Sequence, residues 1–432
     1  MRAALLALPL SPALALAQGA AEPDPPDPWP AIRDERIATL LPDAMDRADV
    51  DAWLVLCREN DNDPMARHVG CENAGREAAF LFFRTAGGAA AYAVSPAGEA
   101  TALAELGRHE EVIQIPRGES VWPSVVALFE RFGPDAVGIN RGTTPIADGL
   151  SSTQYERMRA GLGEWMARTT SAQRLISEWL AIKTPAEVQI LRDAAALTAR
   201  WQEEAYAAAV PGVTTDRDIA DFLEARMAEA GVGDAWAPDQ NPAVNSGRDR
   251  GHSHPTRRAI QPGDFIQTDF GIRVGGMWVT DIQRFAYVLA PGETAPPAEA
   301  LARWEAAKRG RQAAFEAMRP GARGVDVDRA QRAAMRADGS LPVMWSTGHP
   351  VGYWAHDSGP SLGGGQEGRT PAGAQLDRLR PGMTFAFDGF HSWPLDGDGT
   401  KTISVEEMVV ITETGAEWLT PPQEELLLIP SR

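Results

Sequence analysis

The sequence predicts an α+β protein of two domains, a smaller α/β domain followed by a larger domain of helices and antiparallel strands. The length of 432 residues exceeds what one ordinary core accommodates. Up to about residue 170, short apolar runs alternate with helical patterns, which is typical of an α/β unit. From about residue 240, strand-like segments are joined by turn signals. We therefore expect an α/β domain over residues 31–172 and a second domain over residues 173–432.

The charge of the chain limits its partners. Hydrophobic residues make up 44% and charged residues 23%, a balance that argues against a disordered chain and against a membrane protein. The chain has 41 Lys and Arg against 59 Asp and Glu, a formal net charge of −18, which argues against nucleic acid and anionic membranes as partners. Five of the seven histidines fall between residues 252 and 391, and this clustering is the first indication of a site.

Residues 1–17 have the pattern of a secretory signal peptide. One positive charge precedes an apolar stretch, and Ala15-Leu16-Ala17 matches a small-x-small cleavage site. A buried N-terminal helix is the alternative, which Pro9 and Pro12 disfavour. Residues 18–30, with the run PDPPDPWP, are expected to form a stiff, extended leader. No other stretch reaches the roughly 18 apolar residues of a membrane span, so we expect an exported protein, periplasmic or secreted, with no membrane partner once the signal is removed.

The two cysteines, Cys57 and Cys71, are close in sequence. In an exported protein such a pair is expected to form a disulfide, and two free buried thiols are the alternative. Neither cysteine lies near a histidine or in a CxxC pair, which argues against a catalytic or zinc-binding role.

In the α/β domain, the sequence does not cluster acids or histidines and has no phosphate-binding loop. A helix is expected from Ser120 to Phe132, ended by Gly133-Pro134. The expected strands are Ala52–Cys57, Ala79–Phe83, Ala89–Val94, Glu111–Ile115 and Ala136–Ile139. We expect this domain to have a structural or substrate-gating role.

The second domain is expected to begin with a long helical region over about residues 172–209. Within it, Thr184 is placed to cap a helix, with proline in the first turn and Glu187 at the third helical position. Another helix is expected from Thr215 to about Ala230. Further helices are expected over 296–318 and 325–337, and strands over 264–272, 277–289, 383–390 and 402–412.

Asp269 and Asp281 lie on the two arms of a hairpin expected around Gly275-Gly276. A two-residue turn would pair Asp269 with Ile282 and place the aspartates on opposite faces. A three-residue turn or a bulge, which a glycine allows, would pair Asp269 directly with Asp281 on one face. Carboxylates about 5 Å apart across strands repel unless a cation or a shared proton lies between them. Two aspartates at strand ends facing water are the alternative.

Further acids interrupt apolar strands toward the C-terminus. Asp388 lies in MTFAFDGF, and Glu406 and Glu407 lie in ISVEEMVVI. Such acids are costly unless they are paired or bind a metal. His349 and His356 are seven residues apart in GHPVGYWAHDSGP, a spacing that is also common for core histidines. Acidic side chains that face the interior on several strands, with histidines nearby, indicate a site for hard divalent cations.

These motifs, in this order, make the chain resemble the M24 "pita-bread" metallopeptidases, and among them the aminopeptidase P and prolidase branch. Creatinase and methionine aminopeptidase belong to the same family. The resemblance covers about residues 175–425 and implies a pita-bread catalytic domain, preceded by a smaller creatinase-type α/β domain. The matching segments are IKTPAEVQILRDAA, HSHPTRR ahead of PGDFIQTDFG, TDIQRFA, GHPVGYWAHD, PGMTFAFDGF and ISVEEMVVITETGAEWLT.

The resemblance also implies two divalent metal ions, with Mn²⁺ favoured and Co²⁺ or Zn²⁺ as alternatives. Asp281 and Glu406 match the carboxylates that bridge the ions, and His356 matches a histidine that contacts the substrate. The five positions that match metal ligands are Asp269, Asp281, His349, Asp388 and Glu406.

A further catalytic histidine, which flanks the scissile bond, is His252 or His254. Counting back from Gly263 favours His252, and counting forward from Gly247 favours His254. We favour His252 and keep His254 as the alternative.

Three positions depart from the family pattern. Asp388 stands where the family has glutamate, Ser404 where arginine is common, and Glu407 where aspartate is usual. The first change shortens a ligand by one C–C bond, about 1.5 Å, although metal–ligand distances vary by only about 0.2 Å. The backbone must therefore approach the metal, or one ion binds differently.

The function implied by the resemblance is hydrolysis of an Xaa-Pro peptide bond by an exopeptidase of aminopeptidase P or prolidase type, through a hydroxide that bridges two metal ions. The substrate would be a small peptide, and the protein a homo-oligomer, a dimer by resemblance. Two alternatives stay open. One is a creatinase-like, metal-free C–N hydrolase of a small molecule. The other is a binding protein built on a catalytically impaired pita-bread domain, which Asp388 and Ser404 keep open.

Overall fold

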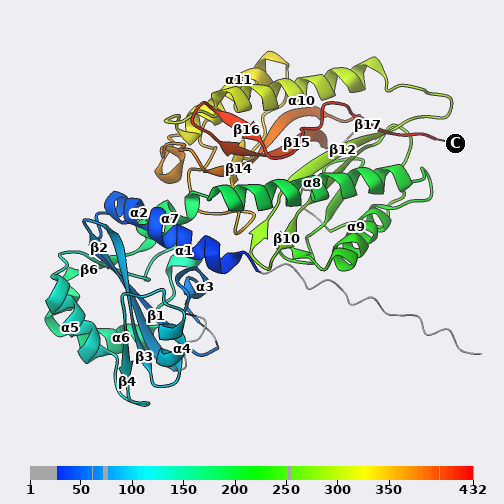
Figure 1. The fold of residues 1–432 in the computed structure, drawn as a ribbon. Helices are drawn as coiled ribbons and strands as arrows, with labels where there is room; N and C mark the ends of the chain where they lie inside the picture. Colours follow the sequence, from blue (N-terminus) through cyan, green and yellow to red (C-terminus); the bar gives the residue numbers. More distant parts are fainter. Residues whose placement is uncertain (1–26, 61, 72–75, 252–253, 398, 432) are drawn as a thin grey trace, which may run out of the picture.

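The computed structural model of the chain describes residues 27–60, 62–71, 76–251, 254–397 and 399–431 (Figure 1). The expected signal peptide, most of the expected leader and His252 lie outside the described residues. Among the described helices, none is both long and apolar enough to cross a membrane.

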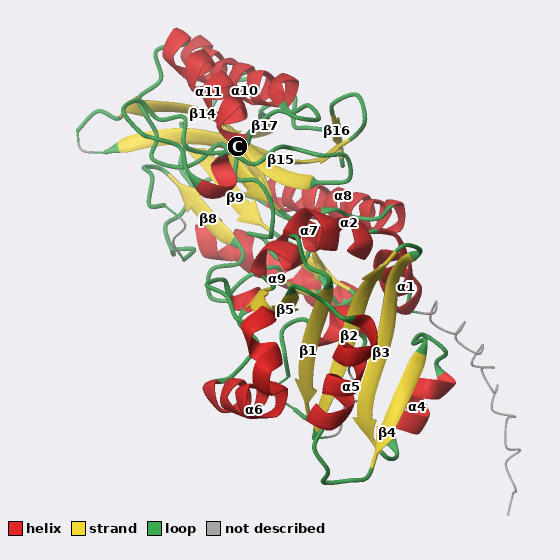
Figure 2. Ribbon diagram, turned by 90° about the vertical axis from the view of Figure 1, so that its left-hand side faces the viewer, coloured by secondary structure: helices red, strands yellow, loops and turns green. Residues whose placement is uncertain are grey.

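The N-terminal domain is built on a six-stranded mixed sheet in the order β4-β3-β2-β1-β5-β6. β1 pairs antiparallel with β2 and parallel with β5. Figure 2 shows β1 to β4 side by side, with α5 packed on one face. The strands are β1 (Ala52–Arg58), β2 (Glu77–Thr85), β3 (Gly88–Pro96), β4 (Glu111–Ile115), β5 (Val137–Ile139) and β6 (Thr169–Ser171). The five expected strands and the expected helix are confirmed.

Helices precede and cover this sheet. The expectation of an extended leader up to Pro30 is wrong at its end, because α1 begins at Trp29 and Pro30 lies in its first turn, where proline is favourable. The helices are α1 (Trp29–Thr39), α2 (Leu41–Ala48), α3 (Ala66–Val69), α4 (Glu99–Glu105), α5 (Trp122–Phe132) and α6 (Ser152–Leu162), with short 3₁₀ turns at Pro145–Ala147 and Gly163–Arg168.

The expected disulfide between Cys57 and Cys71 is confirmed. It joins the end of β1 to the residue that follows α3 and Gly70. The short helix α3 is thereby tied to the central strand of the N-terminal sheet.

The long helical region between the two sheets is two helices, α7 (Gln173–Ala181) and α8 (Pro185–Ala208), and not one. The expected cap is confirmed, because Thr184 accepts from the Glu187 amide and the Glu187 side chain accepts from the Thr184 amide. The residues between the helices are fixed by the other domain. Arg36 of α1 donates to the carbonyl oxygens of Trp179 and Ile182 and to Glu187 Oε2, and both charged side chains are fully buried.

The C-terminal domain contains two four-stranded sheets, β17-β12-β9-β8 and β13-β14-β15-β16, and a small sheet β11-β10-β7. Figure 1 shows α10 and α11 above β14 and β15, and α8 below β12. The helices are α9 (Asp216–Ala230), α10 (Ala298–Ala317) and α11 (Gly324–Ala337), with a 3₁₀ turn at Gly373–Gln375. The strands are β7 (Gly233–Asp234), β8 (Ala243–Ser246), β9 (Phe265–Phe270), β10 (Ile272–Val274), β11 (Trp278–Val279), β12 (Ile282–Val288), β13 (Gly348–Pro350), β14 (Thr384–Pro394), β15 (Thr400–Ile411), β16 (Ala416–Trp418) and β17 (Leu427–Ile429).

The hairpin that carries the two aspartates has a register that differs from both expected ones. Val274 pairs with Trp278, so the loop has three residues, and Asp269 pairs with Gln283. The expectation that Asp269 pairs directly with Asp281 is therefore wrong. Asp281 lies directly before β12, and its side chain still meets that of Asp269.

Candidate metal centre

Two acids of the centre lie directly opposite each other in the second sheet. In the β14–β15 ladder, Asp388 pairs with Glu406. His349 of β13 pairs with Ala386, two residues before Asp388, so His349 and Asp388 project from the same face. The sheet therefore presents two carboxylates and an imidazole to one side.

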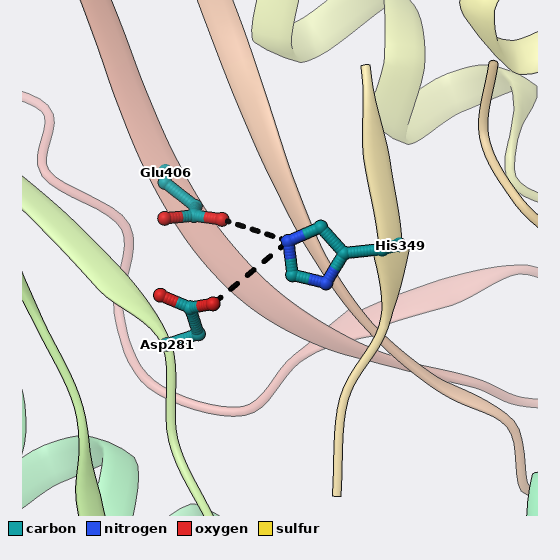
Figure 3. Close-up of side chains that lie close together, drawn as sticks. All are labelled: Asp281, His349 and Glu406. Carbon is teal, nitrogen blue, oxygen red and sulfur yellow. Dashed lines mark ion pairs between the residues drawn. The ribbon is translucent and has the colours of Figure 1, made fainter. Parts of the chain in front are cut away.

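Asp281 meets this group from the other sheet. His349 Nε2 lies 3.8 Å from Asp281 Oδ2 and 3.7 Å from Glu406 Oε1 (Figure 3). One ligand atom from each of these three residues lies within 4.8 Å of the others, close enough to share one cation. The structure thus brings together residues that are 125 positions apart in the sequence, from 281 to 406.

Asp269 and Asp388 complete a dense group of acids. Burial raises the pKa of Asp281 well above its usual range, and the charges of Glu406, Asp269 and Asp388 raise it further. Burial, followed by the charges of Glu406 and Asp269, likewise raises the pKa of Asp388. The four carboxylates are near enough to repel one another, and bound cations would remove this repulsion.

The chemistry of these residues fits divalent cations. Asp281 Oδ1 is buried and accepts no hydrogen bond from any residue in the described part of the chain. An uncompensated buried carboxylate oxygen is unfavourable unless a cation faces it. Four carboxylates and one imidazole form an oxygen-rich set that suits hard or borderline divalent ions.

Of the expected catalytic histidines, the structure places His356 at the metal centre and His254 on the surface. The His356 ring lies at the centre, with its centroid 4.3 Å from that of His349 in an edge-to-face arrangement. His254 is exposed, and its Nδ1 contacts the carbonyl oxygen of Asp239. His252 lies outside the described residues, so the choice between His252 and His254 stays a prediction.

Glu407, next to the ligand candidate Glu406, faces the opposite side of β15. It is fully buried, and its carboxylate accepts hydrogen bonds from Arg284 at 3.0 Å, from Arg311 at 3.2 Å and from the backbone N–H of Gln423 at 2.7 Å. Its partners show a structural role on the face away from the centre.

The motifs drew attention to Ser404 but not to Gln267 and Gln283, the two glutamines that it contacts. Gln283 Nε2 lies 3.4 Å from Asp269 Oδ2, and Gln283 is also bonded to Gln267 and Ser404. Strand alternation could have identified the two glutamines, because each lies two residues from an aspartate and therefore on the same face.

The fold and this group of acids and histidine define a metal-binding enzyme of the mixed α+β class. The chain belongs to metallopeptidase family M24. The model of this family, Peptidase_M24, matches residues 189–413. The expected family is confirmed.

Relatives and solved structures agree with this membership. The protein named probable dipeptidase PepE of Mycobacterium tuberculosis (strain ATCC 25618 / H37Rv) is 27% identical over 290 residues, which cover 66% of this chain and 70% of that protein. The Xaa-Pro dipeptidase from Bacillus anthracis has a similar fold, with a TM-score of 0.64, 19% identity and coverage of 92% of this chain and 99% of that one. The X-Pro aminopeptidase from Thermotoga maritima MSB8 gives a TM-score of 0.65, 19% identity and coverage of 92% and 100%. The expected pita-bread catalytic domain with an N-terminal domain before it is therefore confirmed.

Proposed function

We propose that this protein is a metal-dependent exopeptidase that hydrolyses the peptide bond preceding proline in small peptides. The observation that carries the proposal is the convergence of Asp281, His349 and Glu406 on one point, with Asp269 and Asp388 beside them. The similarity to proteins named Xaa-Pro dipeptidase and X-Pro aminopeptidase supports proline as the specificity element.

The acids and His349 would hold two divalent ions, with Mn²⁺ favoured over Co²⁺ and Zn²⁺. Such ions supply Lewis acidity and an ionised water at neutral pH. His356 lies beside His349 and can hold a proton at the reacting carbonyl or at the leaving nitrogen, since imidazole both donates and accepts protons. His252, or His254 in its place, would contribute a second imidazole.

We also propose that residues 1–17 direct export, which would make the protein periplasmic or secreted. The Cys57–Cys71 disulfide is consistent with an oxidising compartment. We expect the mature enzyme to form homodimers, as the resemblance implies.

The test is reconstitution of metal-free protein with Mn²⁺, Co²⁺ and Zn²⁺ in turn. Each form is assayed on Xaa-Pro dipeptides, Xaa-Pro-Yaa tripeptides and matched peptides with alanine in place of proline. We expect metal-dependent hydrolysis of proline peptides only, and none by an Asp281→Asn variant purified in parallel, which controls for contaminating peptidases.

Two results would overturn the proposal. Inactivity toward every proline peptide with all three metals would exclude an Xaa-Pro peptidase. Full activity of metal-free protein would instead favour a creatinase-like hydrolase.

A further inference from the structure

We infer that Gln283 is a positioning residue that orients the Asp269 carboxylate for metal binding. The inference rests on the proposed metal centre and concerns a residue outside the set of expected ligands. Gln283 pairs directly with Asp269 across the β9–β12 ladder, so the two side chains stand next to each other on the face of the centre. Both are buried, at 4% and 5% exposure, so water does not replace their contact.

The Gln283 amide is oriented by neighbours on both of its sides. Its Oε1 accepts from Gln267 Nε2 at 2.5 Å and from Ser404 Oγ at 2.7 Å, and Gln267 Nε2 also donates to Ser404 Oγ at 3.1 Å. These two donors use both lone pairs of Oε1. A flipped amide would place its Oε1 against the Asp269 carboxylate oxygen, and two acceptors cannot form a hydrogen bond.

This fixed orientation turns Gln283 Nε2 toward Asp269 Oδ2, at 3.4 Å. The donor holds this oxygen of the Asp269 carboxylate in place. Because the amide is neutral, it orients the carboxylate without cancelling the negative charge that attracts the metal. Partners that hydrogen-bond to metal ligands commonly set ligand geometry and affinity in this way.

The network joins three strands of two sheets. Gln267 lies on β9, Gln283 on β12 and Ser404 on β15, two residues before Glu406. The position of Asp269 is therefore coupled to the strand that carries Glu406. The small Ser404 side chain contributes a hydroxyl that both accepts and donates within the network.

The experiment measures the Mn²⁺ dissociation constant and the number of bound ions by titration calorimetry, for wild type and variants stripped of metal. We expect Gln283→Leu and Gln283→Met each to weaken Mn²⁺ binding about 10-fold or more, the range seen when partners of metal ligands are removed. Methionine is unbranched and similar in length to glutamine, but it has no amide to donate to Asp269. It therefore separates the loss of the hydrogen bonds from the loss of packing.

Two control variants separate positioning from general loosening of the sheets. Gln202→Leu removes a buried glutamine of α8 that bonds to Thr268 and Ile282 from the other face of the same strands. Thr402→Val removes a buried hydroxyl of β15 that donates to the Ser392 hydroxyl at 3.0 Å. We expect both to lower the melting temperature and to leave the Mn²⁺ dissociation constant within about twofold of wild type.

Unchanged Mn²⁺ affinity in both Gln283 variants would overturn the inference while leaving the proposed function intact. Equal losses in the Gln202→Leu control would also overturn it, because they would show a structural effect. Wild type that binds no Mn²⁺, Co²⁺ or Zn²⁺ would overturn both proposals together.

Discussion

Glu406 and Glu407 are adjacent on β15, yet their environments are opposite. Glu406 lies 3.7 Å from His349 on the face of the metal centre, whereas Glu407 is neutralised by Arg284 and Arg311 on the other face. Only strand alternation separates them. One glutamate therefore faces the metal centre, and the other is held by two guanidinium groups.

Removing the Asp281 carboxylate is expected to change how stability depends on pH. The pKa of Asp281 is raised in the metal-free fold by burial and then by its acidic neighbours. The folded chain therefore retains a proton that the unfolded chain loses near pH 4, so its stability falls as pH rises from there toward the raised pKa. Asp281→Asn has no carboxyl group to ionise at this position and therefore lacks this loss of stability. We expect the melting temperature of the metal-free variant, relative to wild type, to rise between about pH 5 and 8.

Mn²⁺ provides the matching control, because it binds the ionised carboxylate. We expect it to raise the melting temperature of wild type at neutral pH, with a smaller effect on acidification, and to have little effect on Asp281→Asn. A difference in melting temperature between the two metal-free proteins that stays constant with pH would contradict a buried Asp281 carboxyl with a raised pKa.

Asp388→Glu is expected to tighten metal binding. Asp388 lies directly opposite Glu406 and is shorter than glutamate by one bond, about 1.5 Å. The longer glutamate side chain should reach the cation directly, whereas Asp388 reaches it only if the backbone moves closer to the metal. The measurement is the metal content per chain together with the rate on an Xaa-Pro peptide. Asp388→Asn is the control, since it keeps the size but removes the charge, and weaker binding by Asp388→Glu would show that the backbone already fits aspartate.

At the scale of elements, the β10–β11 turn determines which side chains face the centre. Gly275 and Gly276 have φ of 56° and 64°, a left-handed conformation that glycine adopts without strain. Arg67 of α3 donates to both of their carbonyl oxygens, so the N-terminal domain also holds this turn. The glycine pair could be predicted to form a turn, but its length could not, because turns of two and three residues suit the same glycines.

Gly276→Val is expected to destabilise the protein by about 1–2 kcal/mol, the cost of a left-handed residue with a branched side chain. The measurement is urea unfolding followed by circular dichroism. Gly87→Ala is the control, because that glycine also joins two strands but lies outside the left-handed region, and an added Cβ meets no atom within 4 Å. Equal stability of the two variants would argue that the hairpin readily adopts another turn.

Some helix boundaries are set by neighbouring residues in the sequence, and others are set by residues that are distant in the sequence. The start of α8 follows from local chemistry, since Thr184, Pro185 and Glu187 satisfy the first amides of the helix. The end of α7 at Ala181 was not predicted, and Ile182 after it is held by Arg36 of α1 and by a bridge to Met383. The partner that holds this break, Arg36, lies about 146 positions earlier in the sequence.

At the scale of the whole molecule, a buried charged cluster joins the two domains. Glu187 accepts from Arg36 of the N-terminal domain at 2.7 Å, from Trp278 at 3.2 Å and from the Tyr353 hydroxyl. Tyr353 lies between His349 and His356 in the sequence, and Trp278 lies three residues before Asp281. The N-terminal domain thus supports the segments that carry the centre.

Arg36→Met is expected to destabilise the protein by about 3–5 kcal/mol, because it leaves the Glu187 carboxylate buried without its cation. The double variant Arg36→Met/Glu187→Leu should recover much of this loss, as the unpaired charge is then gone. Chemical unfolding of both variants and of Glu187→Leu completes a double-mutant cycle. Arg47→Met is the control, because the Arg47–Asp43 pair is exposed and should contribute about 1 kcal/mol or less. A comparably small loss for Arg36→Met would contradict a cluster closed to water.

The sequence by itself determined the family, most of the strands and helices, and the set of candidate ligands, because strand alternation, helix caps and motif order are local properties of the chain. Only the tertiary structure decided how Asp281, His349 and Glu406 converge, why Glu407 is excluded from the centre and which neighbours orient Asp269. Those relations depend on the register between strands and on packing between domains. Both are set by side chains far apart in the sequence, whose contacts exist only once the chain has folded.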